Sequence, residues 1–100
     1  MYDPKNVTKF KSLGELAPDA FRGFMGFHNA TFQPGAISLK HKELMAVAVA
    51  LTTQCPYCIE AHSGFARKAG ATEAELAEAT MVAAAIRAGG AVAHGTHTLE

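Results

Sequence analysis

The chain has 100 residues, with nine basic and nine acidic side chains, a net charge of +0 and no cluster of more than two lysines or arginines. This balance argues against nucleic acid or an anionic membrane as the main partner. Hydrophobic residues make up 49% of the chain. A domain of this size has only a modest core of its own, so we expect self-association to cover the remaining apolar surface.

The composition also predicts a cytoplasmic protein without a membrane partner. The longest unbroken apolar run, residues 44–51, covers eight residues, against the roughly 20 that a membrane-spanning helix needs. The segment Met1–Lys5 is polar and lacks the apolar stretch of a signal peptide. Two cysteines three positions apart do not form the disulfide framework of a small secreted protein. In a reducing compartment, such a pair indicates redox chemistry or metal binding.

The predicted fold class is all-α, with one domain over residues 1–100 that contains about five or six helices. Helix-forming residues dominate and alternating β-branched runs are absent. Asp3–Pro4 is an N-cap followed by a first-turn proline, and it predicts a short helix that ends near Gly14. Pro18 opens a second helix, which the segment Gln33–Gly35 ends.

The central part of the chain predicts two further helices. Ser38 can cap a third helix that runs to about Thr53, and its apolar residues on every side predict a central position. Cys55–Pro56 begins a fourth helix, which is predicted to run to Ala69.

The last predicted helix begins at a capping box, Thr72–Glu75, and runs to about Ala88. We expect Gly89–Gly90 to interrupt it. The tail, residues 91–97, is predicted to be helical again.

The fourth helix carries the candidate reactive groups. Successive 100° steps place Cys55, Cys58 and His62 within about 60° of one another around the helix axis. Both thiols then lie near the positive end of the helix dipole, which favours the thiolate. His62 can take or give the proton. Exposure favours Cys55 as the first attacking sulfur, whereas proximity to the base favours Cys58, and we expect the base to activate Cys58.

Glu43 is the predicted partner of His62. It lies 12 residues before Cys55, so the two cannot touch within one helix. If the chain turns back near Gln54, the third and fourth helices pack antiparallel and Glu43 reaches the Cys58–His62 turn. A carboxylate beside an apolar helix needs a partner, and His62 is the obvious one. The sequence therefore predicts a relay from carboxylate to imidazole to thiol.

Two other interpretations remain open at this point. Cys55, Cys58, His62 and His94 could supply four ligands to a zinc ion in an oligomeric scaffold without turnover. Alternatively, His62 or His94 could serve as the acid–base group of a non-redox enzyme in which the thiols are incidental. No phosphate-binding glycine loop and no flavin or nicotinamide fingerprint is present, so we expect no tightly bound cofactor.

Five segments together resemble one known family. They are Lys42–Leu44, Ala46–Leu51, Cys55–Ile59, His62 and Gly70–Thr72. This pattern resembles the alkyl hydroperoxidase D (AhpD)-like branch of the carboxymuconolactone decarboxylase family, over most of the chain. The combined spacing of the glutamate, two cysteines and histidine is far more specific than any of its parts.

The resemblance implies an all-α homo-oligomer, commonly a hexamer or a trimer. It also implies that Cys55 and Cys58 are the catalytic pair, with His62 and Glu43 in the proton relay. In such proteins a dihydrolipoamide-type dithiol reduces the cysteine pair. The pair then passes electrons to a peroxiredoxin, or reduces hydroperoxides itself. The chain departs from the founding members at Tyr57, where they often carry a histidine.

Overall fold

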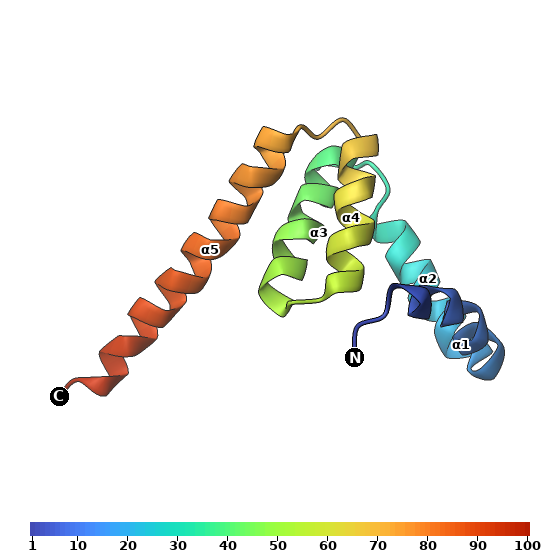
Figure 1. Cartoon of the computed structure of the whole chain (residues 1–100), viewed down its shortest axis with the longest axis horizontal. Helices are drawn as coiled ribbons and strands as arrows, with labels where there is room; N and C mark the ends of the chain where they lie inside the picture. The colour runs from blue at the N-terminus through green and yellow to red at the C-terminus, as the bar shows by residue number, and fades with distance from the viewer. The chain divides into compact units, whose positions relative to one another are not determined.

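The computed structural model describes all residues, 1–100, and confirms the all-α class with five α-helices, two 3₁₀ helices and no strand (Figure 1). The elements in chain order are η1 (Pro4–Lys9), α1 (Phe10–Leu16), α2 (Pro18–Thr31), α3 (Leu39–Thr53), α4 (Pro56–Lys68), α5 (Glu73–Gly95) and η2 (Thr96–Thr98). The chain divides into two compact units, Met1–Leu39 and Lys40–Glu100. A single domain over the whole chain stays a prediction, and each unit is described by itself.

The first unit begins as predicted, with Asp3 as the N-cap of η1, its side chain accepting a hydrogen bond from the Lys5 amide at 3.0 Å. The helix that follows does not end near Gly14 but continues to Leu16. Gly14 is a packing residue, because a Cβ at this position would lie 3.1 Å from the ring of Phe21 on α2. The glycine allows α2 to approach α1 closely without ending the helix.

The second unit contains α3, α4 and α5, and α4 runs antiparallel beside α3 (Figure 1). On α3 the buried positions are Glu43, Val47 and Ala50, spaced as one face of a helix. Met45 and Val49 on the same helix are 53% and 60% exposed. Within this chain α3 is therefore covered on one side only, in contrast to the prediction of a helix surrounded by other elements.

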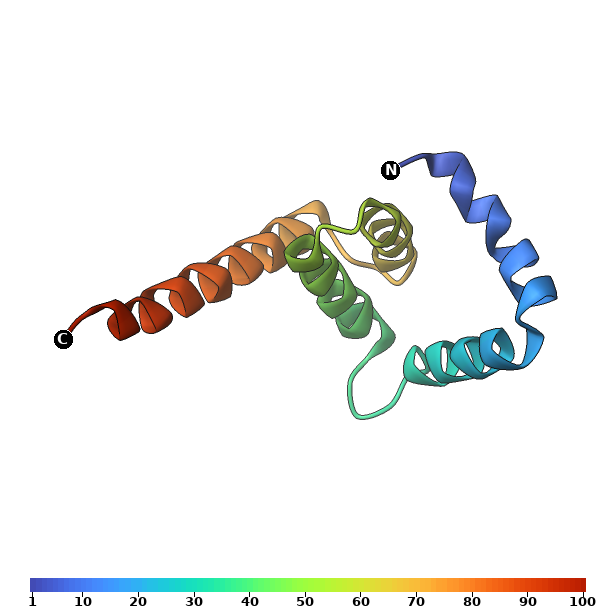
Figure 2. The ribbon, with the colours of Figure 1, turned by 90° about the horizontal axis from the view of Figure 1, so that it is seen from below.

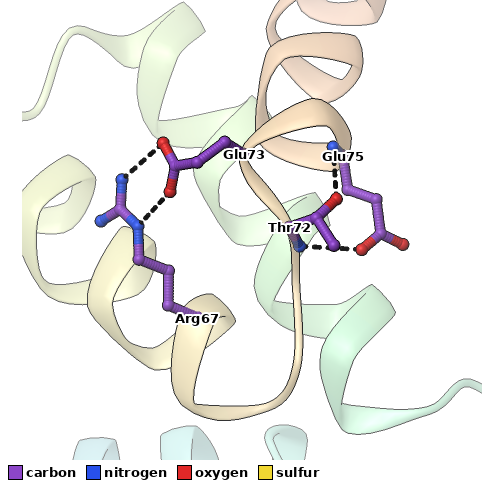
Figure 3. Close-up of polar contacts among 4 residues, drawn as sticks. All are labelled: Arg67, Thr72, Glu73 and Glu75. Carbon is purple, nitrogen blue, oxygen red and sulfur yellow. Dashed lines mark hydrogen bonds and ion pairs between the residues drawn. The ribbon is translucent and has the colours of Figure 1, made fainter.

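The link between α4 and α5 follows the predicted capping signals closely. Gly70 has a φ of +100°, and the amide of the next residue, Ala71, bonds the Ala66 carbonyl at 2.9 Å. This is a Schellman ending, which needs a residue that tolerates left-handed backbone. Figure 3 shows the capping box between Thr72 and Glu75 at the start of α5.

Two ion pairs tie this link to its neighbours. The Arg67 guanidinium near the end of α4 bonds the Glu73 carboxylate at 2.7 Å (Figure 3). The Lys40 ammonium on α3 lies 2.9 Å from the Glu75 carboxylate, so the start of α5 is fastened to the start of α3.

α5 continues through Gly89–Gly90, so the predicted interruption is wrong. Glycine within a helix costs only about 1 kcal/mol relative to alanine, and the long alanine-rich helix before the pair supports its continuation. The C-terminal half of α5 extends beyond α3 and α4 (Figures 1 and 2). The most apolar 18-residue window within Glu73–Thr98 has a mean hydropathy of 1.3, so this helix is long and apolar enough to cross a membrane by length and composition alone. The length of unbroken apolar runs in the sequence did not indicate this helix, because polar residues interrupt its alanine-rich segments.

Candidate functional site

The candidate site begins at the turn between α3 and α4, where Cys55 contributes both to the end of α3 and to the start of α4. Gln54 has a φ of 58°, and the Cys55 amide bonds the Ala50 carbonyl at 3.1 Å. These are the marks of a Schellman ending with glutamine in the left-handed position. Cys55 itself is extended and is the N-cap of α4, with Pro56 in the first turn. The turn that ends α3 thus places Cys55 at the N-terminus of α4.

The two thiols lie within hydrogen-bond distance of each other. Cys55 Sγ is 2.9 Å from Cys58 Sγ, and both cysteines are free. The Cys58 amide also donates to Cys55 Sγ at 3.4 Å, which is the capping bond of α4. Cys55 is half-buried and Cys58 is exposed. A disulfide between them needs only a small side-chain shift, because neighbouring helical turns already hold the sulfurs together.

These contacts separate the pKa values of the two thiols. The hydrogen bond from the Cys58 side chain lowers the pKa of Cys55, and the backbone amides of Cys58 and Tyr57 lower it further. The hydrogen bond to Cys55 raises the pKa of Cys58 to about 11, and partial loss of hydration and the negative charge on Cys55 contribute to this rise. Cys55 is thus the more acidic of the two sulfurs and Cys58 the less acidic one. Activation of Cys58 by the base stays a prediction.

His62 and Glu43 are brought together across the two helices. Glu43 Oε2 on α3 lies 2.6 Å from His62 Nδ1 on α4, and the Glu43 residue is only 4% exposed. A buried carboxylate needs such a partner to offset the loss of water. With Nδ1 engaged by the carboxylate, Nε2 is the ring nitrogen through which His62 can exchange a proton.

Phe65 is a neighbour of this pair that the sequence analysis did not single out. Its ring meets the His62 ring edge-on, with centroids 5.5 Å apart and an interplanar angle of 82°. The contact fixes the plane of the imidazole. The sequence could have indicated this contact, because residues three positions apart on a helix, such as His62 and Phe65, are neighbours.

The four-ligand zinc set is not assembled within this chain. The structure holds no group of three or more His, Cys, Asp or Glu side chains placed to bind a metal ion. His94, the proposed fourth ligand, lies near the end of α5 and its Nδ1 is 3.0 Å from the Gly90 carbonyl oxygen. Its ring also lies against the His97 ring in a tilted arrangement, with centroids 5.8 Å apart. His94 is therefore occupied within its own helix and is not part of the candidate site.

Comparison with known proteins decides the family. A model of the carboxymuconolactone decarboxylase family matches residues 18–100. The chain belongs to the carboxymuconolactone decarboxylase family. A crystal structure of a carboxymuconolactone decarboxylase family protein from Legionella pneumophila superposes with a TM-score of 0.78 and 34% sequence identity. The match covers 82% of this chain and 73% of the Legionella chain, and it confirms the resemblance that the sequence motifs indicated.

Curated relatives agree with this membership without adding an activity. An uncharacterized protein of the cox locus in Paracoccus denitrificans is 47% identical over 76% of this chain and 68% of its own length. An uncharacterized protein from Cupriavidus necator is 37% identical over 70% of this chain, and the match spans 62% of that relative. Since neither has a described activity, the chemistry of this family member has to be argued from its site.

Proposed function

We propose that this protein is a thiol–disulfide oxidoreductase that supports the reduction of hydroperoxides, either directly or by reducing a peroxiredoxin. The observation that carries the proposal is the pair of free thiols 2.9 Å apart whose pKa values are split. A nucleophilic thiolate beside a protonated resolving thiol is the arrangement that disulfide chemistry requires. The His62–Glu43 pair four residues along α4 supplies a proton exchanger.

In the peroxide reaction, the Cys55 thiolate attacks one oxygen of the hydroperoxide. A sulfur–oxygen bond forms and the oxygen–oxygen bond breaks, which leaves Cys55 as the sulfenic acid. The departing alkoxide takes a proton from protonated His62 and leaves as the alcohol. The Glu43 carboxylate stabilises the imidazolium before this transfer, as an orienting carboxylate does in other nucleophile–histidine systems.

The second step forms the disulfide. Cys58 attacks the sulfenic sulfur, the sulfur–sulfur bond forms, and hydroxide leaves as water with the proton that Cys58 gives up. The Cys58 thiol must lose its proton in this step, and His62 has just become a base by giving up its own proton. Overall, one hydroperoxide and two thiols yield an alcohol, water and one disulfide.

The cycle closes by exchange with an external dithiol. We propose a dihydrolipoamide-type donor, whose two thiols become a disulfide while Cys55 and Cys58 return to the reduced state. When a peroxiredoxin is the acceptor, the reduced pair instead transfers its two electrons and two protons to the peroxiredoxin disulfide. The dithiol then acts as an electron carrier and not as the peroxidase itself.

The test is hydroperoxide consumption with a dithiol reductant, with and without an added peroxiredoxin. We expect turnover by the wild type and a loss of at least about 100-fold in both Cys55→Ser and Cys58→Ser, because each removes one half of the disulfide. Mass measurement after alkylation should show two blocked thiols per chain on oxidation and their return with the dithiol. Equal rates in wild type and Cys58→Ser contradict the proposal. Hydroperoxide turnover that survives replacement of both cysteines also contradicts it, because the dithiol would then not be the reductant.

A further inference from the structure

Arg87 on α5 reaches across to the end of α3, close in sequence to the reactive turn. Its guanidinium donates a hydrogen bond to the backbone carbonyl of Thr52. This carbonyl is one of the last four of α3, which have no partner within the helix. Thr52 is followed by two residues and then Cys55, so the bond lies at the base of the turn that carries the thiolate.

The Arg87 side chain lies in a groove between α3 and α5, and this groove leads it to the end of α3. Arg87 lines it together with Leu51, Thr52, Thr80, Ala83 and Ala84. Ala83 is 7% exposed and lies one helical turn before Arg87, on the same face of α5. Its small side chain lets the helices approach, and the aliphatic part of the arginine then lies along the groove with its charged end at the α3 terminus.

The turn beneath this contact is strained. Gln54 adopts a φ of 58°, a conformation that costs a residue with a Cβ about 1–2 kcal/mol. Such a conformation persists only where surrounding contacts over-determine it. Local hydrogen bonds hold this turn, from the Cys55 amide and the Thr53 hydroxyl to the Ala50 carbonyl. The Arg87 bond to Thr52 is the contact that reaches it from α5.

Arg87 differs from the other arginines in having no carboxylate partner. Arg22 pairs with Asp19 and Arg67 pairs with Glu73, whereas the hydrogen bond of Arg87 is to a backbone carbonyl. Its positive charge therefore lies uncompensated at the negative end of the α3 dipole. That end faces the turn where the Cys55 thiolate resides, so the cation also reduces an unfavourable field on the thiolate.

We propose that Arg87 is a positioning residue for the dithiol: by bonding the Thr52 carbonyl, it holds the end of α3 in the turn that presents Cys55 at the start of α4. Arg87 acts through the backbone of the turn and touches no reacting atom. The inference rests on the proposed function in that it takes the Cys55 thiolate as the reactive group.

The test measures how fast iodoacetamide alkylates Cys55 as a function of pH, in a Cys58→Ser background. Arg87→Met should slow alkylation at neutral pH by about two- to fivefold, the size of effect that charges at helix ends produce. It should also move the midpoint of the rate profile to higher pH. Arg87→Lys keeps the charge and one donor and should restore most of the rate. Gln54→Gly in the Arg87→Met background should recover part of it, since glycine adopts the left-handed turn without strain.

Arg67→Met is the matched control, because it removes an exposed, hydrogen-bonded arginine at the opposite end of α4. We expect it to leave the alkylation profile of Cys55 unchanged, although it removes a contact to α5. An Arg87→Met profile identical to the parent overturns the inference, and so does an equal slowing in Arg67→Met. The measurement needs no hydroperoxide. A protein that shows the Arg87 effect but consumes no peroxide therefore contradicts the proposed function and supports this inference.

Discussion

Cys55 combines three roles in one residue. Its amide closes the end of α3, its sulfur caps α4, and the same sulfur accepts the hydrogen bonds that lower its pKa. The helix start supplies the backbone donors, and the neighbouring Cys58 supplies the thiol donor. Cys58 has the opposite environment, because a proton removed from it would leave two negative sulfurs 2.9 Å apart. The reactivity of the site is therefore set by the asymmetry of the pair.

This asymmetry predicts the pH dependence of alkylation at each sulfur. Only thiolates react, so the Cys55 rate should rise and level off below the ordinary pKa of 9.0, because its own pKa is lowered. The Cys58 rate should still be rising near pH 11. In Cys55→Ser, Cys58 loses the negative neighbour that raises its pKa and should react faster at pH 8 than it does in the wild type. Limited alkylation followed by peptide mass analysis measures both rates. Faster reaction of Cys58 than of Cys55 in the wild type at pH 7 contradicts the assignment.

At the scale of elements, two glycines that both looked like helix breakers in the sequence behave in opposite ways. Gly70 ends α4 because its φ of +100° is one that other residues rarely adopt. Gly90 lies within α5, in helical backbone, and a Cβ added there would meet nothing within 4 Å. The backbone conformation at Gly70 requires a glycine. Gly90, by contrast, only lowers the stability of a helix that forms in spite of it.

Replacement by alanine should therefore change stability in opposite directions. Gly90→Ala should stabilise the protein by about 0.4–1 kcal/mol, because the unfolded chain loses freedom and the helix loses nothing. This corresponds to a rise in Tm of about 2–8 °C. Gly70→Ala, the matched control, should lower the stability by about 1–2 kcal/mol through left-handed strain. Thermal unfolding followed by circular dichroism at one protein concentration measures both. A lower Tm for Gly90→Ala would mean that its open side is covered by another molecule.

For the whole molecule, the dominant feature is apolar surface that the chain itself leaves uncovered. On α5 the exposed side chains are Met81, Val82, Ile86 and Val92, between 61% and 76% exposed. Their spacing places them within about 140° around the helix axis, on the side away from the groove that Arg87 lines. A continuous apolar face of this kind marks an interaction surface. We propose that it is buried between copies of the chain in a homo-oligomer, a hexamer or alternatively a trimer.

Sedimentation velocity over a range of concentrations should accordingly show a defined oligomer and little monomer. Ile86→Glu should dissociate it, because a carboxylate buried in an apolar interface is costly, while the 72% exposure of Ile86 leaves the chain's own fold intact. Lys68→Glu changes a charge on an exposed residue of α4 and should leave the assembly unchanged. A monomer at every concentration, or a chain that floats with lipid vesicles through α5, contradicts the oligomer.

The sequence by itself determined the helical class, the family and most helix ends, because capping residues, prolines and helix-forming composition act locally. It also indicated that Glu43 meets His62, since helix length and a short turn leave few other arrangements. Three features were decided only by tertiary structure. Gly14 became a packing residue because Phe21 lies over it. The pKa of Cys55 is lowered and that of Cys58 is raised because the hydrogen-bond partners of each sulfur depend on how the turn is held. Arg87 reached that turn from 35 residues away, a contact that no local pattern encodes because it depends on how two helices pack.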